Sequence, residues 1–140
     1  MKYFVVKYTD DIPEKFGGQT FGPLIMLRPQ YTNDKGLLEH EKTHVRQWYA
    51  MLALGLVLCT LLTLLVTPTF WTLFGVAPSL HQLIYKLIRP YRRWCEVQAY
   101  RKQLATGGYT SHEFAVSALV EKYDFNSVSY THLTLPTSDL

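Results

Sequence analysis

Short apolar segments alternate with polar turns at the start of this chain. Residues 3–8 and 20–27 are rich in β-branched and aromatic residues, which predicts two strands. Pro23 lies inside the second segment and Pro29 follows it. Because proline cannot donate to a strand ladder, we expect the strand at 20–27 to lie at a sheet edge.

A long helical pattern follows, polar in its first third and apolar afterwards. It extends from Leu37 to about Val66, and Asn33 or Asp34 can cap its start. No charged residue or histidine occurs from Trp48 to Leu80. Pro68 interrupts the pattern, and a second apolar segment returns to about residue 88, which predicts an apolar helical hairpin over about 48–88.

Two further helices are expected near the C-terminal end. The first is basic and amphipathic, from Tyr91 to Ala105, and the second begins at Thr110 or Ser111 and runs to about Tyr123. The fold class is therefore α+β, with short N-terminal antiparallel strands, the long helix and its hairpin, and these two helices. The length of 140 residues fits one domain, which we place at 1–127.

Composition excludes several classes of protein. A hydrophobic content of 48% and a net charge of only +3 exclude a disordered chain. The basic residues form no stripe, so nucleic acid is not an expected partner. Cys59 and Cys95 provide neither a disulfide framework nor a CxxC pair, and no signal peptide is expected before the first segment.

Residues 128–140 read VSYTHLTLPTSDL and differ in character from the rest. Codon by codon, Val128 to Thr137 can be back-translated to the transposon end and adapter of sequencing libraries. We therefore expect a non-native tail here, with the natural C-terminus missing, and do not count His132 as a ligand.

The motif His40-Glu41-Lys42-Thr43-His44 lies on the predicted long helix. Residues four apart share a helix face, so both imidazoles can bind one tetrahedral metal ion. Glu41, beside the first histidine, can then accept a proton from metal-bound water. The alternative is an exposed helix turn with two solvated histidines.

A catalytic zinc ion needs a third protein ligand and one open position. The downstream candidates are His81, Glu96, His112, Glu113, Glu121 and Asp124. Glu96 is the best of these, because it lies on a separate helix; otherwise it is a surface carboxylate paired with Arg92 or Arg93. His81 reads as a polar interruption of a buried segment, and His112 as a residue at a helix N-terminus.

The sequences HEKTHVRQ at 40–47 and EVQAYR at 96–101 resemble a known class. H-E-x-x-H followed by E-x-x-A is similar to the glutamate-zincins, among them the membrane zinc peptidases of the CAAX-protease and heat-shock type. It also resembles short bacterial and phage proteins with H-E-x-x-H-V-R-Q and E-V-x-A-Y-R signatures. The likeness extends over about residues 20–105.

The resemblance implies a minimal zincin-like metallopeptidase with one Zn²⁺ ion. His40, His44 and Glu96 would be its ligands, and Glu41 the general base. The edge strand, through Phe21, Gly22, Leu24 and Ile25, would pair with an extended peptide substrate. Tyr100 stands where the membrane peptidases carry Asp, and either Tyr100 or Arg101 would stabilise the transition state.

The apolar hairpin predicts contact with a lipid bilayer. Ala50 to Val66 would span about 25 Å, and Trp48 and Tyr49 extend it towards the hydrocarbon thickness of about 30 Å. Basic residues flank both ends of the hairpin, which favours both ends, and the active site, on the cytoplasmic side of the membrane. The alternative is a cytoplasmic protein whose hairpin is buried in the domain or in a dimer.

Three functions remain open from the sequence. The first is a membrane-associated zinc peptidase. The second is a non-catalytic membrane protein in which zinc only joins two helices, with His81 or Cys95 in the fourth position. The third is a membrane adaptor that binds no metal.

Overall fold

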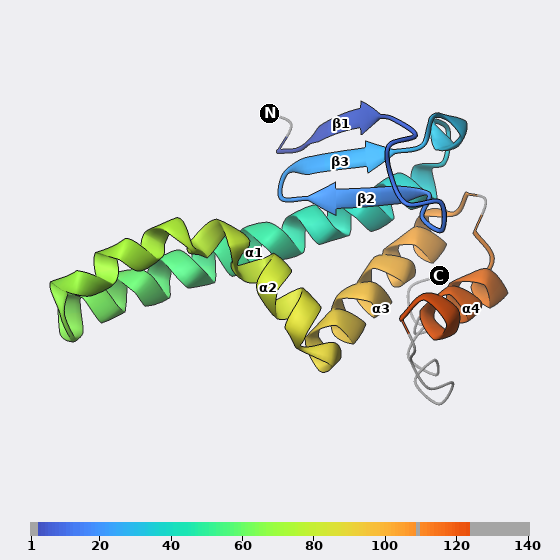
Figure 1. Ribbon diagram of the computed structural model, residues 1–140. Coiled ribbons are helices and arrows are strands. Elements are labelled where there is room, and N and C mark those ends of the chain that lie inside the picture. Colours follow the sequence, from blue (N-terminus) through green and yellow to red (C-terminus); the bar gives the residue numbers. More distant parts are fainter. Residues whose placement is uncertain (1–2, 109, 124–140) are drawn as a thin grey trace.

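The computed structural model describes residues 3–108 and 110–123 and has an α+β fold (Figure 1), as predicted. A three-stranded sheet covers the N-terminal part of a long helix, and that helix continues far beyond the sheet. The predicted tail at 128–140 lies outside the described residues, and the single domain at 1–127 stays a prediction.

The sheet contains β1 (Val5–Tyr8), β2 (Gly18–Phe21) and β3 (Leu24–Leu27) in the order β1-β3-β2. β2 pairs with β3 antiparallel, whereas β1 pairs with β3 parallel. The expectation of antiparallel strands was therefore wrong for β1. The link from β1 does not form a hairpin with β3, because β2 comes between them in the chain.

The predicted strand at 20–27 is two strands joined by a tight turn. Phe21 is paired with Leu24, so Gly22 and Pro23 form a two-residue loop, and Gly22 has a φ of 58°. Such loops favour glycine at the first position, because a side chain there is strained. β3 is consequently the central strand, and the expectation that Leu24 and Ile25 lie at an edge was wrong; β1 and β2 are the two edge strands.

Helix α1 (Lys35–Leu65) begins at Asp34, whose side chain accepts a hydrogen bond from the Leu37 amide at 3.0 Å. Ile25, Leu27 and Val45 form a buried cluster between the sheet and this helix. Burying each such side chain contributes about 1.5–3 kcal/mol. This cluster fixes the first half of α1 against the sheet.

The chain then returns along α1 through short helical pieces (Figure 1). These pieces are η2 (Pro68–Gly75), η3 (Ala77–Ser79) and α2 (Leu80–Leu87). A further short helix, η1 (Pro29–Tyr31), lies before α1 and is not part of the return. The predicted hairpin is thus present, but its second arm is broken rather than one helix. The arms meet closely at Gly55, where a Cβ atom would lie 3.3 Å from the Cβ of Ala77.

Helix α3 (Arg89–Thr106) crosses beneath the sheet and packs against α1, and α4 (His112–Tyr123) packs on α3. Tyr100 joins Ala115, Ala118 and Leu119 in a second buried cluster between α3 and α4. The structure therefore holds one face of α3 against the first half of α1, and this is where the motif residues meet.

Candidate metal centre

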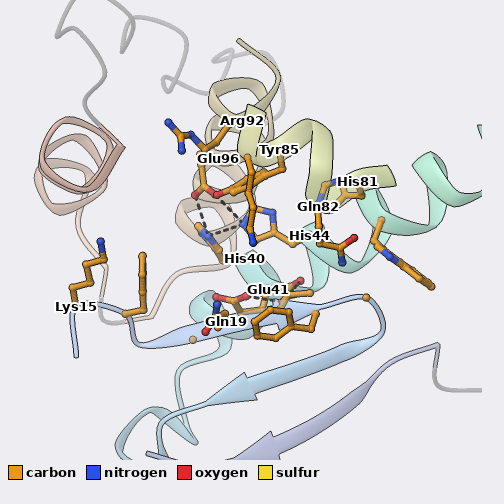
Figure 2. Close-up of a pocket in the computed structure, with 17 residues that line it drawn as sticks. Lys15, Gln19, His40, Glu41, His44, His81, Gln82, Tyr85, Arg92 and Glu96 are labelled. Atoms are coloured by element: carbon orange, nitrogen blue, oxygen red, sulfur yellow. Dashed lines mark hydrogen bonds and ion pairs between the residues drawn. The ribbon is translucent and has the colours of Figure 1, made fainter. Parts of the chain in front are cut away.

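The two motif histidines lie on one face of α1 and point the same way (Figure 2). Their Nε2 atoms are 3.2 Å apart. A tetrahedral zinc ion with bonds of about 2.0–2.1 Å holds its ligand atoms about 3.3–3.4 Å apart. The imidazoles therefore have the separation that a shared ion requires.

Glu96 reaches the same point from α3. Its Oε1 is 3.4 Å from Nε2 of His44, and its Oε2 is 3.7 Å from Nε2 of His40. The three ligand atoms lie within 4.8 Å of one another. With 1% of its surface exposed, Glu96 is not the surface partner of Arg92 or Arg93 that the sequence left open; its carboxylate faces the two histidines.

A buried carboxylate facing two imidazole nitrogens fits a divalent metal ion. Burying a carboxylate is unfavourable unless a cation or hydrogen bonds compensate for its lost hydration. Two nitrogens and one carboxylate are a ligand set typical of catalytic zinc. The residues at this site therefore fit Zn²⁺.

Gln47 orients His44. Its side-chain Nε2 donates to the Cys95 carbonyl at 3.1 Å, which turns its Oε1 towards Nδ1 of His44 at 2.9 Å. Because that oxygen only accepts, Nδ1 carries the proton and Nε2 keeps its lone pair for a metal. The sequence reasoning missed this residue, although it lies three positions after His44 in the same motif.

Glu41 lies between the edge strand β2 and the metal-ligand group and is buried. Its Oε2 accepts a hydrogen bond of 2.6 Å from the Thr20 hydroxyl. A Cβ atom on Gly18 would lie 2.7 Å from its Oε1, so a larger residue there would displace the Glu41 carboxylate. Burial raises the pKa of Glu41 above its usual range, while nearby His44 and the Thr20 hydrogen bond act against that rise.

A cavity of about 300 Å³ opens beside the three ligands, between β2 and the helices α2 and α3 (Figure 2). His40, His44, Glu41 and Glu96 all line it. So do Phe21 and Gly22 among the predicted substrate-contacting residues. A second cavity, of about 510 Å³, is also lined by His40 and Glu41.

The two predicted transition-state stabilisers differ in position. The Tyr100 ring packs edge-on against His40, with 4.6 Å between centroids, and lines the second cavity. Burial raises the pKa of its hydroxyl, which therefore stays protonated. Arg101 lines neither of these two cavities.

Tyr85, on α2, is a site residue that the sequence did not predict. Its hydroxyl donates to Oε1 of Glu96. No local pattern identifies it, because its position depends on how the hairpin returns. His81 is buried, as expected, and its Nδ1 lies 2.9 Å from the Tyr91 hydroxyl, while His112 begins α4.

Comparisons of the chain with family models, with curated proteins and with solved structures found no match. The assignment of the site to a chemistry therefore depends on the arrangement of its own side chains, and the likeness to glutamate-zincins stays a prediction.

Proposed function

We propose that this protein is a zinc-dependent metallopeptidase with His40, His44 and Glu96 as the metal ligands. The observation that carries the proposal is the convergence of these three side chains from two helices, with all ligand atoms within 4.8 Å. The neighbouring Glu41 and the adjoining cavity support a catalytic rather than a purely structural ion.

When bound, zinc would polarise the scissile carbonyl and lower the pKa of an attacking water. Glu41 would accept the proton of that water and pass it to the leaving amine. Its raised pKa suits this exchange, because a base that titrates closer to neutral pH also serves as the acid. Gln47 would keep His44 in the tautomer that binds metal.

An extended peptide is the substrate that this arrangement favours. β2 has a free edge within the sheet, and its residues Gln19, Thr20 and Phe21 line the cavity. A peptide paired with this edge by backbone hydrogen bonds would pass beside Glu41 and the metal ligands.

The test is zinc content and peptide hydrolysis of the full chain purified in detergent. We expect one zinc per chain, lost in His44→Ala and in Glu96→Ala. Glu41→Gln should keep zinc and lose hydrolysis by about 10²–10⁴-fold, the usual effect of removing a general base. Glu39→Gln, two residues earlier on the same helix, is the matched control and should change neither.

Zinc that persists in His44→Ala would remove the proposed site, and activity that persists in Glu41→Gln would remove the proposed base. The non-catalytic reading, in which zinc only joins two helices, requires a fourth protein ligand. Neither His81 nor Cys95 belongs to the ligand group found among the described residues, which favours an open position.

We also propose that the hairpin inserts into a lipid bilayer, with the metal centre at its cytoplasmic base. Among the described residues, α1 is the one helix long and apolar enough to cross a membrane, and only 11% of its most apolar window is buried. A helix in the core of a soluble domain would be mostly buried. Leu64 and Leu65, for example, are 75% and 78% exposed.

A further inference from the structure

Three cationic side chains line the metal cavity: Lys15, Lys86 and Arg92. Within the described part of the chain, none of them forms an ion pair with a carboxylate. Other basic residues do, such as Arg28 with Asp10 and Arg46 with Glu39. Among residues 3–108 and 110–123, the cations of the cavity therefore have no acidic partner.

The carboxylates that line the same cavity interact with residues other than these three cations. Glu96 faces the two histidines and accepts from Tyr85, and Glu41 accepts from Thr20. A bound divalent ion would add further positive charge. The cavity therefore attracts an anionic group.

Arg92 is the cation best placed to bind that group. It is half-buried, it precedes Glu96 by one turn of α3, and its buried Nε makes no hydrogen bond to the described residues. Figure 2 shows Arg92 next to Glu96, above the ligand group in this view, and Lys15 lower, beside the strands. Arg93, the next residue, is exposed and does not line the cavity.

We infer that Arg92 binds a carboxylate of the peptide substrate, close to the bond that is cleaved. This inference rests on the proposed peptidase function. A guanidinium matches a carboxylate with two parallel hydrogen bonds. One helical turn separates Arg92 from Glu96, about 6 Å along the axis, and a peptide advances about 3.3 Å per residue. The carboxylate therefore lies within about two or three residues of the scissile bond.

Two sources supply this carboxylate: the C-terminus of the peptide, or an Asp or Glu side chain. A lipid phosphate is a different occupant and less suited, because Arg92 lines the cavity whereas Arg93 is the exposed one. The site thus selects acidic peptides or peptides cut near their C-terminus.

The experiment measures binding rather than hydrolysis, in the full chain carrying Glu41→Gln. Three N-terminally fluorescein-labelled hexapeptides of one neutral sequence are compared by anisotropy: the free acid, its C-terminal amide, and the amide with one Glu in place of a neutral residue. Each peptide is titrated with the zinc-loaded protein and again with the protein after its zinc has been removed by a chelator. A loss of binding caused by a failed metal site is thereby distinguished from a loss caused by Arg92.

We expect a peptide with a carboxylate to bind about tenfold more tightly than the neutral amide, as a charge-assisted hydrogen bond provides. A preference for the free acid identifies the C-terminus, and a preference for the Glu peptide identifies a side chain. Adding Arg92→Gln should reduce the preference to less than about twofold, Arg92→Lys should keep part of it, and Arg93→Gln should leave it unchanged.

Equal affinity for all three peptides would overturn the inference, as would a preference that survives Arg92→Gln. Flotation with phosphatidylserine vesicles provides the remaining arm. If Arg92→Gln weakens flotation while the peptide preference is unchanged, the arginine binds lipid headgroups and the inference is wrong. Far-ultraviolet circular dichroism checks that each variant is folded.

Discussion

The two halves of α1 differ in which side chains are buried and which are exposed. In the first half, the buried residues include the polar His40, Glu41, Thr43 and Gln47. In the second half, most of the leucines are exposed, Leu52 and Leu62 are half-buried, and only Gly55 and Cys59 are fully buried, with Gly55 facing the return arm. Polar residues are usually exposed and leucines usually buried. The first half of this helix departs from the first tendency, and the second half departs from the second.

This difference supports the proposed contacts of the two halves, a metal ion at the first half and lipid at the second. Buried polar groups persist in proteins when they are hydrogen-bonded or bind a metal, and those of the first half converge on one point. An exposed leucine face is stable when its solvent is not water. We therefore attribute the buried polar residues of the first half to the proposed metal site, and the exposed leucines of the second half to the proposed contact with lipid.

The largest expected effect comes from placing a charge in the exposed half. Leu58 is 52% exposed, so Leu58→Lys disturbs little of the packing within the chain. A lysine near the middle of a membrane helix costs about 2.5–3.5 kcal/mol, or roughly 100-fold in partitioning. We expect flotation with phospholipid vesicles to fall accordingly, whereas Leu58→Ala should float like the unaltered chain.

If Leu58→Lys floats normally, the second half of α1 does not contact lipid, and the comparison between the halves loses its explanation. A cytoplasmic protein with a self-associating hairpin would then be the better description, and the oligomeric state in solution would test it.

A smaller effect is expected in the buried half, at Gln47. Gln47→Ala removes the acceptor for Nδ1 of His44 and the donor to the Cys95 carbonyl. Loss of such an outer hydrogen bond lowers metal affinity about 10–100-fold. Competition with a fluorescent zinc chelator measures this change.

The role of Gln47 is to position His44, so stability alone does not test it. Gln47→Glu keeps an acceptor for Nδ1 and should recover part of the affinity. The metal-free melting temperature should not follow the same order. Arg46→Ala, one residue earlier, should leave zinc affinity unchanged, and an equal loss there would contradict the assignment.

The smallest effect concerns the pH profile. The Thr20 hydrogen bond stabilises the charged form of Glu41 and so lowers the pKa of that carboxyl. Thr20→Val removes the bond, and the pKa rises further. Because a general base must be deprotonated, activity falls as pH falls through this pKa, and the acid limb of kcat/KM should move to higher pH. Thr63→Val, in the second half of α1, should not move it; a shift to lower pH in Thr20→Val would contradict the proposed base.

Helices were predictable because their signals are local. A few adjacent residues determine each helix boundary: the cap at Asp34, the break at Pro68 and the end of α3 before Gly107. The turn at Gly22 was missed because apolar residues continue on both sides of it, so the pattern suggested one strand. The parallel pairing of β1 was missed because strand order is not a local property.

At the site, motif spacing predicted that His40 and His44 share one helix face, and the structure brings Glu96 to them. Glu96 was preferred to the other acidic candidates because it lies on a separate helix. Tyr85 and Arg92 depend on how the hairpin returns, and no spacing rule contains that information. Arg101 illustrates the limit of a motif, since a neighbour in sequence need not line the same cavity.

The broken return arm lies between the first two ligands and the third. His44 cannot meet Glu96 until the apolar segment has turned back on itself, so the centre forms only after a long-range loop has closed. Before the hairpin closes, a nascent chain therefore has no complete set of metal ligands. The ligand group can therefore be complete only after the chain has been synthesised as far as Glu96 and the hairpin has closed.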